Sequence, residues 1–150
     1  MIVRRCTIAE LEAAPNLDEV LAEYATESSI PELGPARAQA EIYRAMESAG
    51  FLHPIAAFYE SRLVGIILPI VITLPHYGVV AATVESFFVP ASERKKGVGL
   101  ELLARAKQVA TELGAKALLL SAPVDSVLDA TMRMSKSFRH SNNVYVVALT

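Results

Sequence analysis

The segment from Arg94 to Gly99 constrains the fold most, because it joins two sequence patterns of different period. It follows an apolar run that ends at Pro90, and it opens a segment whose apolar residues recur at helical spacing. The N–H groups of a first helical turn lack intrahelical partners and lie at the positive end of the helix dipole, so they suit a bound anion. Gly97 and Gly99 carry no Cβ atom that would hold an anion away from this backbone. Three basic residues add positive charge: Arg94, Lys95 and Lys96. The pattern predicts a strand, an anion-binding turn and a helix.

The first fifty residues read as a strand followed by helices. Residues 2–6 predict a short opening strand, and Thr7 and Glu10 have the spacing of a capping box at a helix start. Asn16 is placed to cap a second helix with its side chain. Pro35 suits the first position of a further helix, which Gly50 closes.

From residue 55 onward the period changes to that of strands. Residues 55–59 and 63–74 predict two antiparallel strands, and residues 79–89 predict a third long strand. After the glycine turn comes a helix that Gly114 ends. The remainder predicts a short strand over 117–121, a helix over 126–134 and a closing strand over 144–149. Residues 1–150 therefore read as one domain of mixed α/β class, with helices on both sides of a sheet.

Composition excludes several function classes. The chain has 150 residues, is 53% hydrophobic and has a formal net charge of −2, which fits a globular domain and argues against a nucleic-acid binder. The apolar balance also points to a possible homodimer. The longest apolar run, residues 64–74, is too short to cross a membrane and no signal peptide precedes it, so we expect a cytoplasmic protein. Cys6 reads as a small buried hydrophobe, and His76 and His140 read as exposed loop residues. No His, Cys or Asp spacing indicates a metal site.

Spacing narrows what the glycine turn can be. A P-loop needs a Lys-Ser/Thr pair that does not follow Gly99, and a dinucleotide-binding turn needs a third glycine where the chain has Leu102. Arg94-x-x-Gly97-x-Gly99 instead resembles the acetyl-CoA site of the GNAT superfamily of N-acetyltransferases. The preceding Phe88-Val89-Pro90 and the later Gly114-Ala115 also look like that family's flanking segments.

The resemblance implies a fold, a co-substrate and a reaction. The fold would be a mostly antiparallel sheet of six to seven strands, flanked by about four helices and splayed between its fourth and fifth strands. Acetyl-CoA would donate its acetyl group directly to a primary amine. The N–H groups from Lys95 to Leu100, including that of Val98, would hold the pyrophosphate. Phe88 and Val89 would align the pantetheine arm, and an N–H there would stabilise the oxyanion.

The reaction includes two proton transfers: the amine must lose a proton, and the leaving thiolate must gain one. Glu85 is the one acidic residue on the third long strand, so it is the candidate base or substrate anchor. The family's usual acid, a tyrosine, would fall at Arg133, and its usual asparagine near Ser126. Ser135, Tyr145 or water could replace that acid, whereas Arg133 and Lys136 could contact the cofactor's phosphates.

The resemblance places the acceptor between the N-terminal helices and the loop before the last strand. Tyr24, Glu27 and Asn142 are the candidate substrate-binding residues there. Glu23, Glu27 and Glu32 make the region acidic, which would attract a cationic amine. The acceptor could be a small molecule or a protein amine. An alternative to the enzyme is a catalytically silent acyl-CoA-binding or regulatory module, because the usual tyrosine is missing.

Overall fold

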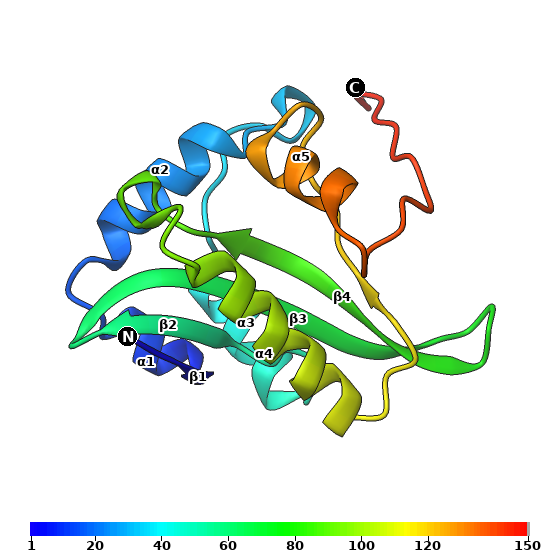
Figure 1. The fold of residues 1–150 in the computed structure, drawn as a ribbon, viewed down its shortest axis with the longest axis horizontal. Helices are drawn as coiled ribbons and strands as arrows, with labels where there is room; N and C mark the ends of the chain where they lie inside the picture. Colours follow the sequence, from blue (N-terminus) through cyan, green and yellow to red (C-terminus); the bar gives the residue numbers. More distant parts are fainter. Residues whose placement is uncertain (150) are drawn as a thin grey trace.

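One mixed sheet forms the centre of the protein. The computed structural model describes residues 1–149, and its sheet has the order β1-β2-β3-β4-β5 (Figure 1). Neighbouring strands are antiparallel except β5, which runs parallel to β4. The bounds are Ile2–Arg5 for β1, Ile55–Tyr59 for β2, Arg62–Leu74 for β3, Val79–Phe88 for β4 and Leu118–Leu119 for β5. The predicted class is confirmed, although the sheet within residues 1–149 has five strands and not six to seven.

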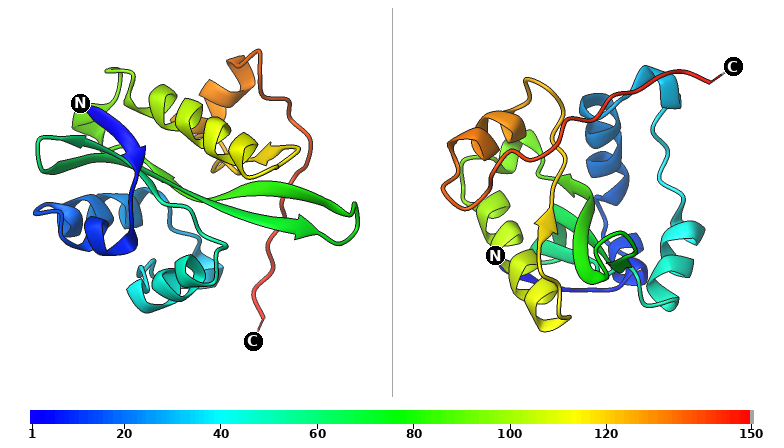
Figure 2. Two further views of the ribbon diagram at one scale, coloured as in Figure 1. Left: turned by 90° about the horizontal axis from the view of Figure 1, so that it is seen from below. Right: turned by 90° about the vertical axis from the view of Figure 1, so that its right-hand side faces the viewer.

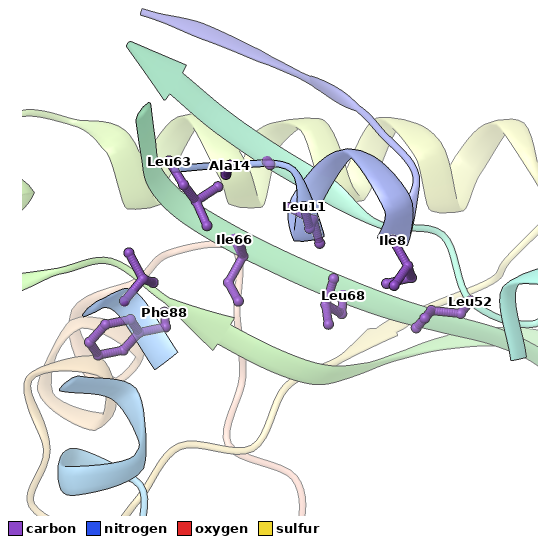
Figure 3. Packing of buried hydrophobic residues seen from close by; sticks show 10 residues of the cluster. Ile8, Leu11, Ala14, Leu52, Leu63, Ile66, Leu68 and Phe88 are labelled. Carbon is purple, nitrogen blue, oxygen red and sulfur yellow. The ribbon is translucent and has the colours of Figure 1, made fainter. Parts of the chain in front are cut away.

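Helices cover both faces of this sheet (Figure 2). Three lie on one face, α1 (Ile8–Glu12), α2 (Leu17–Glu27) and α3 (Ala40–Ser48), and two lie on the other, α4 (Val98–Glu112) and α5 (Val127–Met134). One short 3₁₀ turn, η1 (Pro31–Leu33), lies between α2 and α3, and a second, η2 (Ala91–Glu93), lies between β4 and α4. Each face has its own apolar core: Leu11, Leu68 and Phe88 belong to the first (Figure 3), and Ile67, Leu102 and Val109 to the second.

The start of the chain corrects two sequence expectations. The capping box at Thr7 and Glu10 is confirmed, since each side chain accepts a backbone N–H from the other residue. Asn16 precedes α2 but does not cap it with its side chain. That side chain instead pairs with both backbone groups of Leu63 in β3, at 2.9 and 2.8 Å. The helix predicted from Pro35 begins at Ala40, because residues 35–39 are exposed and only the later turns reach the core.

The predicted closing strand over residues 144–149 is wrong. This segment is in no strand, and its large apolar side chains are between 56% and 92% exposed. The sequence has strong strand propensity, yet a strand also needs a partner edge. The edge strand β5 is only two residues long, and the segment runs away from it (Figure 1).

Candidate active site

The anion-binding turn lies where β4 gives way to α4. Gly97 is the N-cap of α4 and has a left-handed backbone with φ of 84°, and nothing lies within 4 Å of the position that a Cβ there would take. Lys95 is also left-handed, with φ of 64°, which is uncommon for a residue with a side chain and marks a constrained turn. Within residues 1–149, no hydrogen bond uses the backbone N–H groups from Lys95 to Leu100.

These features fit the diphosphate of coenzyme A. Successive N–H donors around left-handed residues form a concave anion site, and open space beside Gly97 leaves room for it. Val98 anchors the turn because its side chain is buried, and Gly99 lies against Phe87, whose ring would be 3.5 Å from an added Cβ. Leu100 is exposed and lines a groove between α4 and α5.

Two of the three basic side chains of the turn, those of Arg94 and Lys96, pair with other groups of the protein. The Arg94 guanidinium donates to the Val89 carbonyl at 2.9 Å and to the Glu27 carboxylate at 2.6 Å. It also lies over the Phe88 ring, 5.6 Å from its centroid. Lys96 pairs with Glu93 at 3.0 Å. Arg94 therefore clamps the turn to α2, while no ion pair within residues 1–149 involves the exposed Lys95.

Sequence reasoning missed Gly65, the position in β3 against which α4 packs. A Cβ on Gly65 would lie 2.8 Å from the Leu102 side chain and 3.0 Å from that of Val98, so the absence of a side chain here lets α4 pack closely on β3. The available signal was a lone glycine inside a long apolar strand, which is typical of a close backbone approach.

Glu85 occupies a β-bulge. Leu68 pairs with Ser86 and Pro69 pairs with Val84, so Glu85 is the extra residue of β4. Bulges next to active sites re-aim a side chain. Here the exposed Glu85 carboxylate accepts the Tyr43 hydroxyl at 3.0 Å and the Ser86 hydroxyl at 2.5 Å.

Tyr43, on α3, is a second residue that sequence reasoning missed. Burial, with the nearby Glu85 charge, raises the pKa of Tyr43 to about 12, although the Ser86 hydroxyl opposes this. It is therefore a neutral hydrogen-bond donor at ordinary pH. Its place on the apolar face of a predicted helix gave no sign that this face lies over β4. The predicted substrate residue Tyr24 lies nearby, with its ring 4.8 Å from that of Phe88. The Phe88 side chain is buried in the core, so only its backbone can face a ligand.

The strands splay as the resemblance implied. Only Ala82 and Thr83 of β4 pair with β5, through Leu118 and Leu119. The end of β4, from Glu85 to Phe88, therefore has no β5 partner, and its backbone is available on that side.

The structure does not bring the other candidates to Glu85. The Ser135 hydroxyl accepts the N–H groups of Ser137 and Phe138, which orders the turn after α5. Asn142 and Tyr145 lie in the exposed C-terminal segment, where Tyr145 is 87% exposed. Arg133 pairs with Asp129 at 3.1 Å, and Lys136 is exposed. Ser126 caps α5 through the Asp129 N–H.

Part of the negative charge expected near the acceptor is taken up by contacts within the protein. Glu23 accepts the Ala91 N–H at 2.7 Å, and Glu27 pairs with Arg94. Glu32 is exposed. As expected, His76 and His140 are exposed, whereas Cys6 is only partly buried.

Comparison with known proteins identifies the family. A model of the acetyltransferase (GNAT) family matches residues 16–134. The chain belongs to this family. No curated protein matches it. Within residues 1–149, no helix is long and apolar enough to cross a membrane, and no group of three or more metal-ligating side chains occurs.

Solved structures share the fold of this GNAT protein at low sequence identity. A ribosomal-protein-alanine N-acetyltransferase from Brucella melitensis biovar Abortus 2308 has a TM-score of 0.73 and 17% identity, over 99% of this chain and 100% of that one. An aminoglycoside acetyltransferase from an uncultured soil metagenomic sample, in complex with sisomicin, has a TM-score of 0.75 and 15% identity, over 99% and 96%. A transcriptional regulator from Bacillus halodurans C-125 has a TM-score of 0.68 and 17% identity, over 97% and 99%.

Proposed function

We propose that this protein transfers an acetyl group from acetyl-CoA to a primary amine. The observation that carries the proposal is the pairing of two features at one end of β4. The turn from Lys95 to Leu100 presents N–H groups with no hydrogen-bond partner among residues 1–149, and the bulged Glu85 carries an exposed carboxylate. Membership of the GNAT family supports the proposal that the turn and Glu85 serve the same reaction.

Each part of the site has a chemical task. Acetyl-CoA, when bound, supplies an acyl thioester that an amine can attack. The backbone from Lys95 to Leu100 holds the diphosphate, and the unpaired end of β4 aligns the pantetheine arm beside Phe88 and Val89. A free alkylamine is mostly protonated at neutral pH, since its pKa is about 10. Glu85 takes that proton, directly or through one water, and Tyr43 and Ser86 hold its carboxylate in place.

The proton for the departing thiolate comes from water in this proposal. Ser135 is occupied in ordering its own turn, and Tyr145 is exposed in the C-terminal segment. They stay the candidate protein donors. A Ser135→Ala or Tyr145→Phe variant that loses activity with unchanged acetyl-CoA binding would assign the role to that residue.

The acceptor is a primary amine of a small molecule or of a protein. Tyr24 and Glu27 of α2 lie beside the turn and β4, through contacts with Phe88 and Arg94, which supports a place for them at its entrance. Asn142 would join them only if the C-terminal segment moves. The acetyltransferases that share this fold act on acceptors as different as a ribosomal-protein alanine and an aminoglycoside, so the fold does not select among amines.

A catalytically silent acyl-CoA-binding or regulatory module is the second candidate. The observation that favours it is Arg133, which stands at the usual acid position and is held by Asp129. A protein described as a transcriptional regulator shares the fold.

Cofactor binding and turnover can be tested separately. We expect acetyl-CoA to raise the thermal unfolding midpoint, and an amine panel to release free thiol. Gly97→Val should abolish the shift. Gly114→Val is the matched control, because Gly114 has the same left-handed backbone and open surroundings at the opposite end of α4. A shift that survives in Gly97→Val would contradict both candidate functions. A shift without turnover on any amine or protein would favour the silent module.

Glu85→Gln tests the base. If Glu85 deprotonates the amine, the variant should lose far more rate near neutral pH than at high pH, where the amine is already neutral. An equal loss at both would remove Glu85 from this role.

A further inference from the structure

Two glutamates of α2 contact the segment that connects β4 to α4, which passes beside α2 in Figure 1. Glu23 accepts the Ala91 N–H at 2.7 Å, and Glu27 accepts the Arg94 guanidinium at 2.6 Å. Residues four apart lie on the same side of a helix, so both contacts come from one side of α2. Within residues 1–149, no other hydrogen bond joins residues 91–96 to α1–α5 or to a strand.

The position of Glu27 is unfavourable for α2 considered alone. Glu27 is the last residue of this helix and lies at the negative end of the helix dipole, where basic side chains are favoured. Its one ion-pair partner among the described residues is Arg94. A local cost that the rest of the fold offsets is typical of a functional position. This conflict supports a role for Glu27 outside its own helix.

Arg94 transmits the contact from α2 to the turn. Its guanidinium also donates to the Val89 carbonyl at 2.9 Å and lies over the Phe88 ring, so it joins α2 to the end of β4. The next residue, Lys95, has a left-handed backbone with φ of 64°, a conformation that persists only where the surroundings hold it. Lys95 is also the first residue of the row of N–H groups that extends to Leu100. A fixed Arg94 therefore fixes the start of this row.

We propose that Glu27, acting through Arg94, is a positioning residue for acetyl-CoA binding, and that Glu23 supports it through Ala91. This role rests on the proposed function, in which the turn holds the diphosphate. The two carboxylates do not touch acetyl-CoA. They hold the N–H donors in the arrangement that the diphosphate needs, so that less order has to be imposed when it binds. Two acidic residues at the acceptor entrance thus serve the co-substrate.

Electrostatic repulsion alone predicts the opposite effect of removing Glu27. Acetyl-CoA is an anion, so a carboxylate near its diphosphate should repel it, and loss of that charge should strengthen binding. If Glu27 positions the turn, loss of its carboxylate should weaken binding, because Arg94 loses the partner that holds it. The sign of the change in affinity therefore separates the two roles.

Calorimetric titration with acetyl-CoA measures that sign. We expect Glu27→Ala to raise the Kd of acetyl-CoA about 5-fold, near the upper range for a partly exposed ion pair. Glu27→Gln keeps an acceptor for Arg94 and should give a smaller rise. Glu19→Ala is the matched control, because it removes the same charge from the same helix but from a pair with Arg62 in β3. An unchanged or lower Kd in Glu27→Ala overturns the proposal.

A double variant and steady-state kinetics test how Glu27 acts. If Glu27 works through Arg94, adding Glu27→Ala to Arg94→Gln should weaken acetyl-CoA binding no further, because the two residues form one unit. A further loss of the same size would overturn the proposal. In Glu27→Ala the KM for acetyl-CoA should rise, whereas the KM for the amine should not change. A rise in the amine KM alone would make Glu27 an acceptor ligand instead.

NMR relaxation of the backbone amides, measured without any ligand, tests the positioning apart from the proposed function. The order parameters of residues 95–97 should fall in Glu27→Ala and stay unchanged in Glu19→Ala. Equal order in both variants overturns the positioning role. If the unmodified protein did not bind acetyl-CoA, the proposed function would fail, whereas the order parameters would still decide whether Glu27 holds the turn. The two failures are therefore distinguishable.

Discussion

At the scale of single residues, Glu85 depends on its neighbours for its position. A bulge turns it out of the β4 ladder, and two hydroxyl groups on different elements reach its two carboxylate oxygens. The Tyr43 hydroxyl is the one that comes from outside β4. Tyr43 therefore couples the placement of α3 to the orientation of the proposed base.

Removing that hydroxyl should reduce activity without unfolding the protein. A hydrogen bond to a charged group is worth about 1.5–3 kcal/mol, so Tyr43→Phe should lower kcat/KM by about 10- to 100-fold. Steady-state kinetics measures this, and acetyl-CoA binding should stay unchanged. Tyr59→Phe at the exposed end of β2 is the control. Full activity in Tyr43→Phe would show that Glu85 needs no support from α3.

Cys6 makes stability depend on alkaline pH. Burial, followed by the charge of Glu10, raises the pKa of Cys6 from 9.0 to about 12. Between these values the folded protein keeps a proton that the unfolded chain has lost, so the free energy of unfolding falls as pH rises through this window. Thermal unfolding from pH 9 to 12 should show the fall, and Cys6→Ala should make it shallower. Identical slopes would mean that Cys6 ionises equally in both states.

At the scale of elements, most of the framework was predictable from the sequence, because period and turn residues act locally. The capping box at Thr7, the long strands β3 and β4, and the helix after Gly97 were all placed by such signals. Pairing was not predictable in the same way. The bulge at Glu85 and the contact with Tyr43 depend on register and packing between segments far apart in the chain. The segment 144–149 has strand propensity without a strand neighbour, and propensity alone could not show that.

The packing of α4 on β3 depends on the absence of a side chain at Gly65. Gly65→Ala would bring a Cβ to 2.8 Å from Leu102 and 3.3 Å from Val89, so either the Leu102 side chain or α4 as a whole must shift. Overpacking of this kind costs about 1–3 kcal/mol, which chemical denaturation would measure. The acetyl-CoA thermal shift should weaken as the turn moves. Gly99→Ala is the packing control, because its Cβ would meet only ordinary contacts of 3.5 and 3.8 Å. Equal stability of the two variants would contradict this account.

At the scale of the whole molecule, α2 connects the sheet to the proposed cofactor turn. Asn16 fixes its start to Leu63 in β3, and further along Glu23 and Glu27 hold Ala91 and Arg94. Glu23 and Glu27, which sequence analysis assigned to attracting an amine, thus also link α2 to the segment that contains the turn.

Breaking the first of these links should destabilise the whole fold. Asn16 is buried, and Asn16→Ala would leave the Leu63 N–H and carbonyl without partners. Each unsatisfied buried group costs about 1–3 kcal/mol, so we expect a total loss of about 2–5 kcal/mol in the free energy of unfolding. Asn16→Asp keeps an acceptor for the N–H but loses the donor, and Asn143→Ala changes an exposed asparagine as the control. Urea denaturation of the three variants should give a loss only at position 16. If Asn16→Ala matched Asn143→Ala, α2 would be held by its apolar contacts alone.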